Sequence, residues 1–151
     1  MLIDNETVML LKSVILKDGW LELPSMGNSM FPFIQQGNIC RFAPFELSII
    51  KKGDIILFHT PNGQLIAHRY YKKERMENKV QFFCKGDANL GFDQPIEYNQ
   101  ILGKLISVQK GRKKVSPDDQ VSHLWGKMII VFPALSFILR KYLNRNIHLQ
   151  Y

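Results

Sequence analysis

The first residues of the chain carry apolar side chains at helical spacing. A single helix face would hold Val8, Leu11 and Ile15. Asn5 is a residue type that caps helix N-termini, and Asp18-Gly19 supplies a stop signal. This pattern predicts an amphipathic N-terminal helix within residues 1–19.

Between residues 20 and 108 the pattern changes to short β-branched or aromatic runs separated by Gly, Pro and Asn. Such a pattern is typical of an antiparallel meander or barrel. Pro61-Asn62-Gly63 is a hairpin-turn signal between two of the runs. We therefore expect a mainly β, antiparallel and barrel-like domain over residues 20–110, with strands at 20–23, 39–42, 54–58, 64–71, 79–84 and 101–109.

A second helical segment follows the predicted sheet. Ser116 and Pro117, with two carboxylates after them, combine a capping hydroxyl, a proline suited to the first helical position and an acidic first turn. Pro133 should kink this helix. Its longest apolar run, 128–139, has twelve residues, whereas a bilayer-spanning helix needs about 20. Residues 116–151 are therefore predicted to form a C-terminal helical tail without a full membrane crossing.

The net charge of +7 arises in the last third of the chain. Residues 1–103 contain 11 basic and 11 acidic residues, whereas residues 104–151 contain nine basic residues against Asp118 and Asp119. Clustered Lys and Arg beside an apolar run favour an anionic membrane surface, with Trp125 at the interface. No zinc-finger spacing or recognition helix indicates nucleic acid. We expect peripheral membrane contact through the tail; the alternative is that its apolar face packs on the β domain.

Other features of the sequence bear on compartment and cofactors. Cys40 and Cys84 each lie in an apolar run, which favours buried free thiols in a reducing compartment. Charges interrupt the N-terminal apolar residues too often for a signal peptide or a transmembrane anchor. We expect a cytoplasmic protein, or one peripheral to the cytoplasmic membrane. We expect no cofactor and no metal, because ligand-like spacing is missing among His59, His68, His123 and His148.

Four polar residues are candidates for nucleophilic catalysis. Ser29 lies between a Gly-Asn pair and a Met-Phe-Pro stretch, in a turn that can present a hydroxyl at a cleft. His68 lies in a half-buried strand pattern and is suited to accept a proton near pH 7. Asp87 and Asp93 follow the next apolar run, and either could orient the imidazole. Taken singly, each also fits a structural role, as a loop serine, a core histidine or a turn aspartate.

A nucleophilic cysteine is a weaker alternative. Cys84 could in principle pair with a histidine, but its predicted strand would bury the thiol, and buried thiols are usually inert. We therefore favour the serine.

The order of these residues resembles the sequence boxes of signal peptidase I. Residues 27–32 (GNSMFP) match its Gly-x-Ser-Met-x-Pro box, and residues 53–58 (GDIILF) match its Gly-Asp-x-x-x-Phe box. A strand ending in His68-Arg69, a Lys-Gly-Asp box at 85–87 and an Ile-x-Gly-Lys-like strand at 101–104 (ILGK) follow in the family's order. Histidine replaces the lysine base of bacterial-type enzymes, so the chain is similar to the endoplasmic-reticulum-type branch.

The resemblance implies a serine endopeptidase that removes a leader or signal segment from a precursor peptide. It assigns Ser29 as the nucleophile that forms an acyl-enzyme, His68 as the general base, and either Asp87 or Asp93 as the third member. It also implies a groove in which an extended peptide adds as a strand. Many relatives have a serine at the position of Gly27 that assists the oxyanion hole, and here Asn28 is the candidate to act with Ser29.

Two other functions remain open on the sequence. A LexA-like self-cleaving regulator would share the fold, but the chain shows no DNA-binding domain and carries histidine in place of lysine. A catalytically inactive peptide-binding module would keep the groove, because fold alone does not establish activity. Residues 1–24 contain no membrane span of the kind that usually precedes the serine box, so we expect a dedicated precursor as the substrate.

Overall fold

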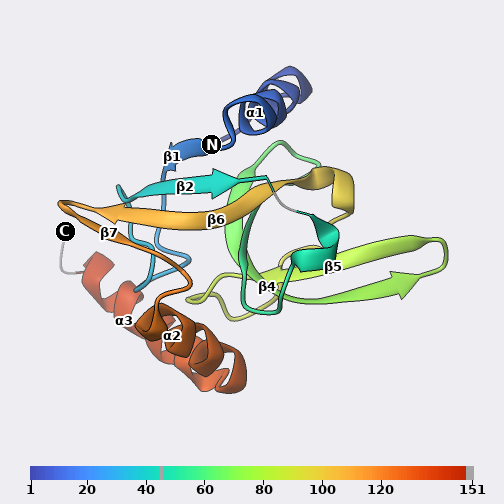
Figure 1. Cartoon of the computed structure of the whole chain (residues 1–151). Coiled ribbons are helices and arrows are strands. Elements are labelled where there is room, and N and C mark those ends of the chain that lie inside the picture. Colours follow the sequence, from blue (N-terminus) through green and yellow to red (C-terminus); the bar gives the residue numbers. More distant parts are fainter. Residues whose placement is uncertain (45, 149–151) are drawn as a thin grey trace.

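The computed structural model describes residues 1–44 and 46–148 (Figure 1). Residues 149–151 of the predicted tail lie outside this part. The described residues form an antiparallel sheet of seven strands, β1 (Leu21–Pro24), β2 (Ile39–Ala43), β3 (Ile55–His59), β4 (Leu65–Met76), β5 (Lys79–Lys85), β6 (Ile101–Lys110) and β7 (Lys113–Val115). The helices are α1 (Asn5–Asp18), α2 (Gln120–Val131) and α3 (Ala134–His148), with short 3₁₀ turns at Leu47–Ile49 and Tyr98–Gln100.

The sheet is an open path in the order β1-β2-β6-β3-β4-β5, with β7 paired to β6. Strand β3 lies in the middle of this sheet, and four successive side chains, at residues 55–58, are buried. Since successive side chains of a strand point to opposite sides, both faces of β3 are covered. Ile55 and Leu57 join a cluster that includes Ile15, Met30 and Phe42. Their neighbours in β3 belong to a second cluster, with Ile56 and Phe58 packed beside Tyr70, Phe82 and Cys84.

The predicted strands are confirmed to within a few residues, except that β4 continues to Met76. The structure adds β7, at Lys113–Val115, which the sequence did not signal. The predicted cap of the first helix is wrong, because Asp4 rather than Asn5 is the N-cap and accepts a hydrogen bond from the Thr7 N–H (2.8 Å).

The predicted start of the second helix is also wrong. Helix α2 begins at Gln120, and Ser116 lies in the preceding turn, where its N–H donates to Asp119 Oδ2 (3.0 Å). The predicted kink near Pro133 is a complete break between α2 and α3. Among the described residues no single helix is long and apolar enough to span a bilayer. Residues 120–131 and 134–146 together meet the length and composition criteria, but they are bent by 103°.

The helices lie at opposite ends of the sheet, and the long β4–β5 hairpin projects away from both (Figure 1). Helix α1 lies near β1 and β6, where its buried Ile15 joins the first core cluster. The α2–α3 pair lies at the other end and reaches the segment after β5 through Arg140, which donates to the Ala88 carbonyl (2.9 Å). This arrangement places α3 against the loop that supports the candidate site.

Candidate active site

Ser29 lies in a tight turn after β1 that is fixed by buried neighbours. The turn is closed by two backbone bonds, from Phe31 N–H to Asn28 O (3.1 Å) and from Ile34 N–H to Met30 O (3.0 Å). Met30 and Ile34 are buried in the first core cluster. The Phe31-Pro32 peptide bond is cis. The apolar part of the GNSMFP box therefore anchors the turn, while Ser29 lies at the wall of a cavity.

His68 lies in β4 opposite Ile56 of β3 and is buried. Its Nε2 lies 2.9 Å from Ser29 Oγ, and its Nδ1 lies 2.6 Å from Asp93 Oδ2. The ring of Phe58 packs edge-on against the imidazole, with ring centroids 6.3 Å apart. The imidazole thus lies between a hydroxyl and a carboxylate, with an apolar ring limiting its movement.

Asp93 is brought to the imidazole by the loop after β5. Its backbone N–H donates to the Cys84 carbonyl (2.9 Å), which ties the loop back to the strand. Its side chain is 19% exposed. Of the two aspartates that the sequence left as alternatives, Asp93 is therefore the one that the structure places on His68.

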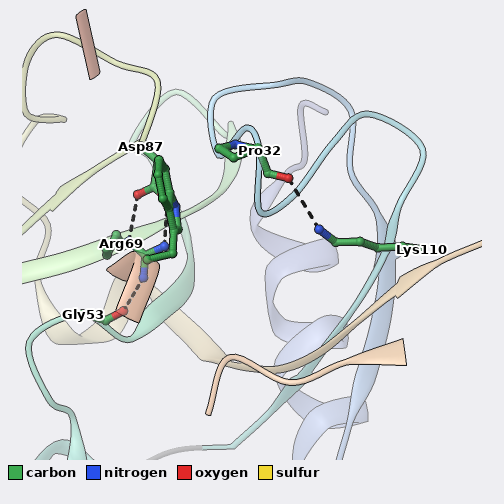
Figure 2. A network of polar contacts seen from close by, with 6 residues as sticks. Pro32, Gly53, Arg69, Asp87 and Lys110 are labelled. Carbon is green, nitrogen blue, oxygen red and sulfur yellow. Dashed lines mark hydrogen bonds and ion pairs between the residues drawn. The ribbon is translucent and has the colours of Figure 1, made fainter. Parts of the chain in front are cut away.

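Asp87 has a different set of partners and is fully buried. Arg69 donates to it through Nε (2.8 Å to Oδ1) and Nη2 (2.7 Å to Oδ2), and Trp125 Nε1 donates to Oδ2 (3.0 Å). Arg69 Nη1 also donates to the Gly53 carbonyl (2.9 Å), as Figure 2 shows. Asp87 therefore joins β4, the loop after β5 and α2 in one buried network.

This network involves residues whose roles the sequence did not reveal. Arg69 was visible only as the second residue of the His-Arg box, and Trp125 was expected at a membrane interface. In the structure the partly buried Trp125 indole packs against the first core cluster and donates to Asp87. The available sequence signal for the ion pair was Arg69 next to His68, followed later in the chain by Gly86-Asp87.

The loop at residues 85–89 supports the backbone of Ser29. Ala88 N–H donates to the Ser29 carbonyl (2.8 Å). A Cβ added to Gly86 would lie 2.8 Å from the same Ser29 oxygen, so only glycine allows this approach without a shift. Arg140 of α3 holds the loop through the Ala88 carbonyl and Asn89 Oδ1 (2.6 Å). The position of Ser29 thus depends on the loop at residues 85–89 and, through this loop, on Arg140 of α3.

Asn28, the predicted oxyanion-hole residue, is fixed through its side-chain oxygen. Asn28 Oδ1 accepts a hydrogen bond from the Gln36 N–H (2.9 Å). That bond leaves the Nδ2 group as the end of the carboxamide that could donate to an oxyanion. The backbone N–H of Ser29 is the other candidate donor.

A cavity of about 340 Å³ adjoins Ser29 and His68. Its walls come from β1, β2, β3 and β4 and are mainly apolar, with Leu23, Ile34, Phe42, Leu57 and Ala67 among them. A space of this size with mainly apolar walls can accept side chains of a peptide.

The two cysteines are buried and unpaired, as predicted. Burial raises the pKa of the Cys40 thiol to about 11 and raises that of Cys84 as well. Protonated, buried thiols are poor nucleophiles, which argues against Cys84 as the reactive group. Within residues 1–44 and 46–148, no cluster of three or more His, Cys, Asp or Glu side chains could hold a metal ion.

The structure thus brings Ser29, His68 and Asp93 into one hydrogen-bonded chain and places Asp87 in a separate ion pair. A hydroxyl, an imidazole and a carboxylate in this order are the groups of a Ser-His-Asp triad, which carries out acyl transfer. A scan of the sequence against protein-family models gives no match, and neither does a search of curated proteins.

Proposed function

We propose that this chain is a serine endopeptidase of the signal peptidase I superfamily, of the endoplasmic-reticulum type. The observation that carries the proposal is the chain of contacts from Ser29 Oγ to His68 Nε2 (2.9 Å) and from His68 Nδ1 to Asp93 Oδ2 (2.6 Å). Ser29 lies beside a cavity, which would give its hydroxyl access to a peptide. The open antiparallel sheet would be a variant of the family's barrel-like domain.

In the proposed reaction Ser29 Oγ attacks the carbonyl carbon of the substrate while His68 Nε2 takes the hydroxyl proton. His68 then returns this proton to the leaving amine as the C–N bond breaks, which leaves an acyl-enzyme on Ser29. Water, deprotonated by His68, hydrolyses the ester and releases the new carboxyl end. Asp93 accepts a hydrogen bond from Nδ1–H, which orients the ring and stabilises the imidazolium.

The oxyanion would be held by the backbone N–H of Ser29 and by Asn28 Nδ2. Donors that are already fixed when charge develops stabilise a transition state without reorganisation. The bond from Gln36 N–H to Asn28 Oδ1 provides such fixation for the carboxamide.

The proposed substrate is a precursor that enters as an extended strand along β4. Residues 65–68 of β4 pair with β3 on one side, whereas β5 pairs only from Arg69 onwards. The outer edge of β4 next to His68 is therefore available for β-strand addition. The neighbouring cavity would receive a side chain of the leader segment.

Cleavage of a peptide library, with mass spectrometry of the products, tests the activity. We expect Ser29→Ala and His68→Ala to lower the rate by about 10⁴-fold or more. Ser48→Ala and His123→Ala are matched controls, because both residues are exposed and neither belongs to the proposed triad. If folded wild-type protein binds library peptides as well as Ser29→Ala does and cleaves none, the peptidase proposal fails and the peptide-binding module replaces it.

Peripheral membrane contact through α2 and α3 is a separate part of the proposal. The exposed apolar side chains of this pair and of the break between its helices include Leu124, Val131, Phe132, Phe137 and Ile138. Lys127, Lys141 and Arg145 are exposed on the same helices and would face anionic headgroups. The buried free thiols fit the reducing cytoplasm, so the cytoplasmic face of the membrane is the proposed location.

Vesicle flotation tests this contact. The wild-type protein should float with vesicles that contain anionic lipid, and Phe137→Asp should reduce the bound fraction. Ile49→Asp is the control, because Ile49 is exposed on a 3₁₀ turn outside the helix pair. Equal flotation of all three proteins, or none, would contradict the contact.

A further inference from the structure

The first three residues of the chain are paired with the edge of β4. Leu2 forms an antiparallel bridge with Gln64. The bridge is flanked by two backbone hydrogen bonds, from Ile3 N–H to the Gly63 carbonyl (2.7 Å) and from Leu65 N–H to the Met1 carbonyl (3.1 Å). Met1 also lines the cavity that adjoins Ser29 and His68. The segment 1–3 therefore reaches the proposed peptide cleft at the end away from the catalytic groups.

The hydrogen-bonding pattern of β4 shows which edge groups remain open. Thr60 N–H donates to the Gln64 carbonyl and Tyr70 N–H donates to the Asp54 carbonyl, so even-numbered residues of this strand bond towards β3. Odd-numbered residues then face the outer edge. The N–H of Leu65 is taken by Met1, and Arg69 pairs with Lys85 of β5. Between them lies Ala67, whose N–H and C=O face the cleft.

We propose that Met1–Ile3 is a specificity element that closes one end of the peptide cleft. It leaves the edge at residues 66–68 for substrate and so limits strand pairing to three residues on one side of the cleaved bond. At about 3.3 Å per residue this open edge is roughly 10 Å long. The inference rests on the proposed function, because it assumes that a peptide lies along β4 next to His68.

The contacts of residues 1–3 indicate why this segment can close one end of the peptide cleft. Met1 is 56% exposed and Leu2 is 74% exposed, so little apolar burial holds these side chains. The segment is instead held by backbone bonds to the β4 edge, the same kind of bond that an added peptide strand would form. A longer peptide would have to displace the backbone bonds between residues 1–3 and β4. Each net backbone hydrogen bond corresponds to about a fivefold change in affinity.

Gly63 makes the close approach possible. A Cβ on Gly63 would lie 2.3 Å from the Ile3 carbonyl oxygen, and its φ is +80°. Gly63→Ala should therefore push the segment off the edge. Gly111→Ala is its matched control, because Gly111 also has positive φ (+61°) in a hairpin turn but has open space around its Cβ position.

A second pair of variants separates the segment from the turn. Ile3→Pro removes the N–H that bonds Gly63, whereas Leu2→Pro leaves both backbone bonds to β4 possible, because the N–H of Leu2 points away from β4. The readout is binding by fluorescence polarisation, with all variants in the Ser29→Ala chain to prevent turnover. The probes are fluorescein-labelled peptides centred on an Ala-Ala bond and lengthened one residue at a time towards either end.

In the Ser29→Ala chain, the affinity for the labelled peptides should rise with peptide length and stop rising at the third residue on one side of the central bond. With Ile3→Pro or Gly63→Ala it should continue to rise with length, by about fivefold for each added backbone hydrogen bond, whereas Leu2→Pro and Gly111→Ala should behave like the parent. The same length dependence in all five proteins would overturn the inference. If the peptides bind with the expected length dependence but the wild type never cleaves them, only the peptidase proposal fails. If no protein binds any peptide, both fail.

Discussion

The two aspartates of the candidate site should respond in opposite ways to the same substitution. Asp87 is fully buried and receives two bonds from Arg69 and one from Trp125. Asp93 is partly exposed and contacts His68. Replacing either residue with asparagine keeps the shape of the side chain and removes its charge. The pair Asp87→Asn and Asp93→Asn therefore separates a structural carboxylate from a proposed catalytic one.

The magnitudes follow from the partners that are left behind. Asp87→Asn would leave Arg69, whose side chain is 5% exposed, without its counter-charge. Breaking a buried pair in this way costs about 3–5 kcal/mol of unfolding free energy, which lowers Tm by roughly 6–20 °C in a chain of this size. Asp93→Asn should change stability by less than about 1.5 kcal/mol. Its kcat should fall by about 10⁴-fold, because an amide no longer selects the required tautomer.

Thermal unfolding followed by circular dichroism measures the first effect, and cleavage rates normalised to folded protein measure the second. Trp125→Phe gives an intermediate reference, because it removes one hydrogen bond to Asp87 and should cost about 1.5–3 kcal/mol. The assignment would be refuted if Asp87→Asn melted at the wild-type temperature. It would also be refuted if Asp93→Asn kept its kcat within about tenfold of wild type.

Three further predictions concern the loop at residues 85–89 and the Cys40 thiol. Gly86→Ala should lower kcat by about 10²-fold, because its Cβ would press on the Ser29 carbonyl, whereas Gly91→Ala, with open space, should not; equal rates in a cleavage assay would contradict this. Burial raises the pKa of Cys40 from 9.0 to about 11, so native protein at pH 8 should react with iodoacetamide about 100-fold more slowly than unfolded protein. The stabilisation linked to this thiol is complete below pH 9 and is lost as the pH rises through about 11; a urea titration across this range that shows constant stability would exclude the effect.

Most of the sheet could be predicted because its strands carry strong local signals. The run Ile55–Phe58 is apolar throughout, which fits a central strand buried on both faces. Strand β7, at Lys113–Val115, has no such signal, since its place depends on pairing with β6. The same limit applies to helix starts. Asn5 and Asp4 are both good caps, and only the bond to Thr7 N–H distinguishes them.

The candidate site was predictable in its residue types but not in all of its contacts. Ser29 and His68 could be picked out by the order of their boxes, whereas the choice between Asp87 and Asp93 depends on how the loop after β5 folds back. The partners of Asp87 come from β4 and α2, and no local pattern encodes such a contact. The pairing of residues 1–3 with β4 is likewise a contact between segments distant in sequence.

The hydrogen bond between Arg140 and the loop that carries Ala88 has a consequence for the stage of synthesis at which the position of Ser29 is fixed. Ser29, His68 and Asp93 leave the ribosome before α3, yet the Ala88 carbonyl that accepts the bond from Arg140 belongs to the residue whose N–H holds Ser29. A nascent chain that has exposed only the sheet therefore lacks part of the support for Ser29, the proposed nucleophile. Translation of α3 would complete this support, so the proposed activity towards neighbouring polypeptides would be delayed until α3 has formed.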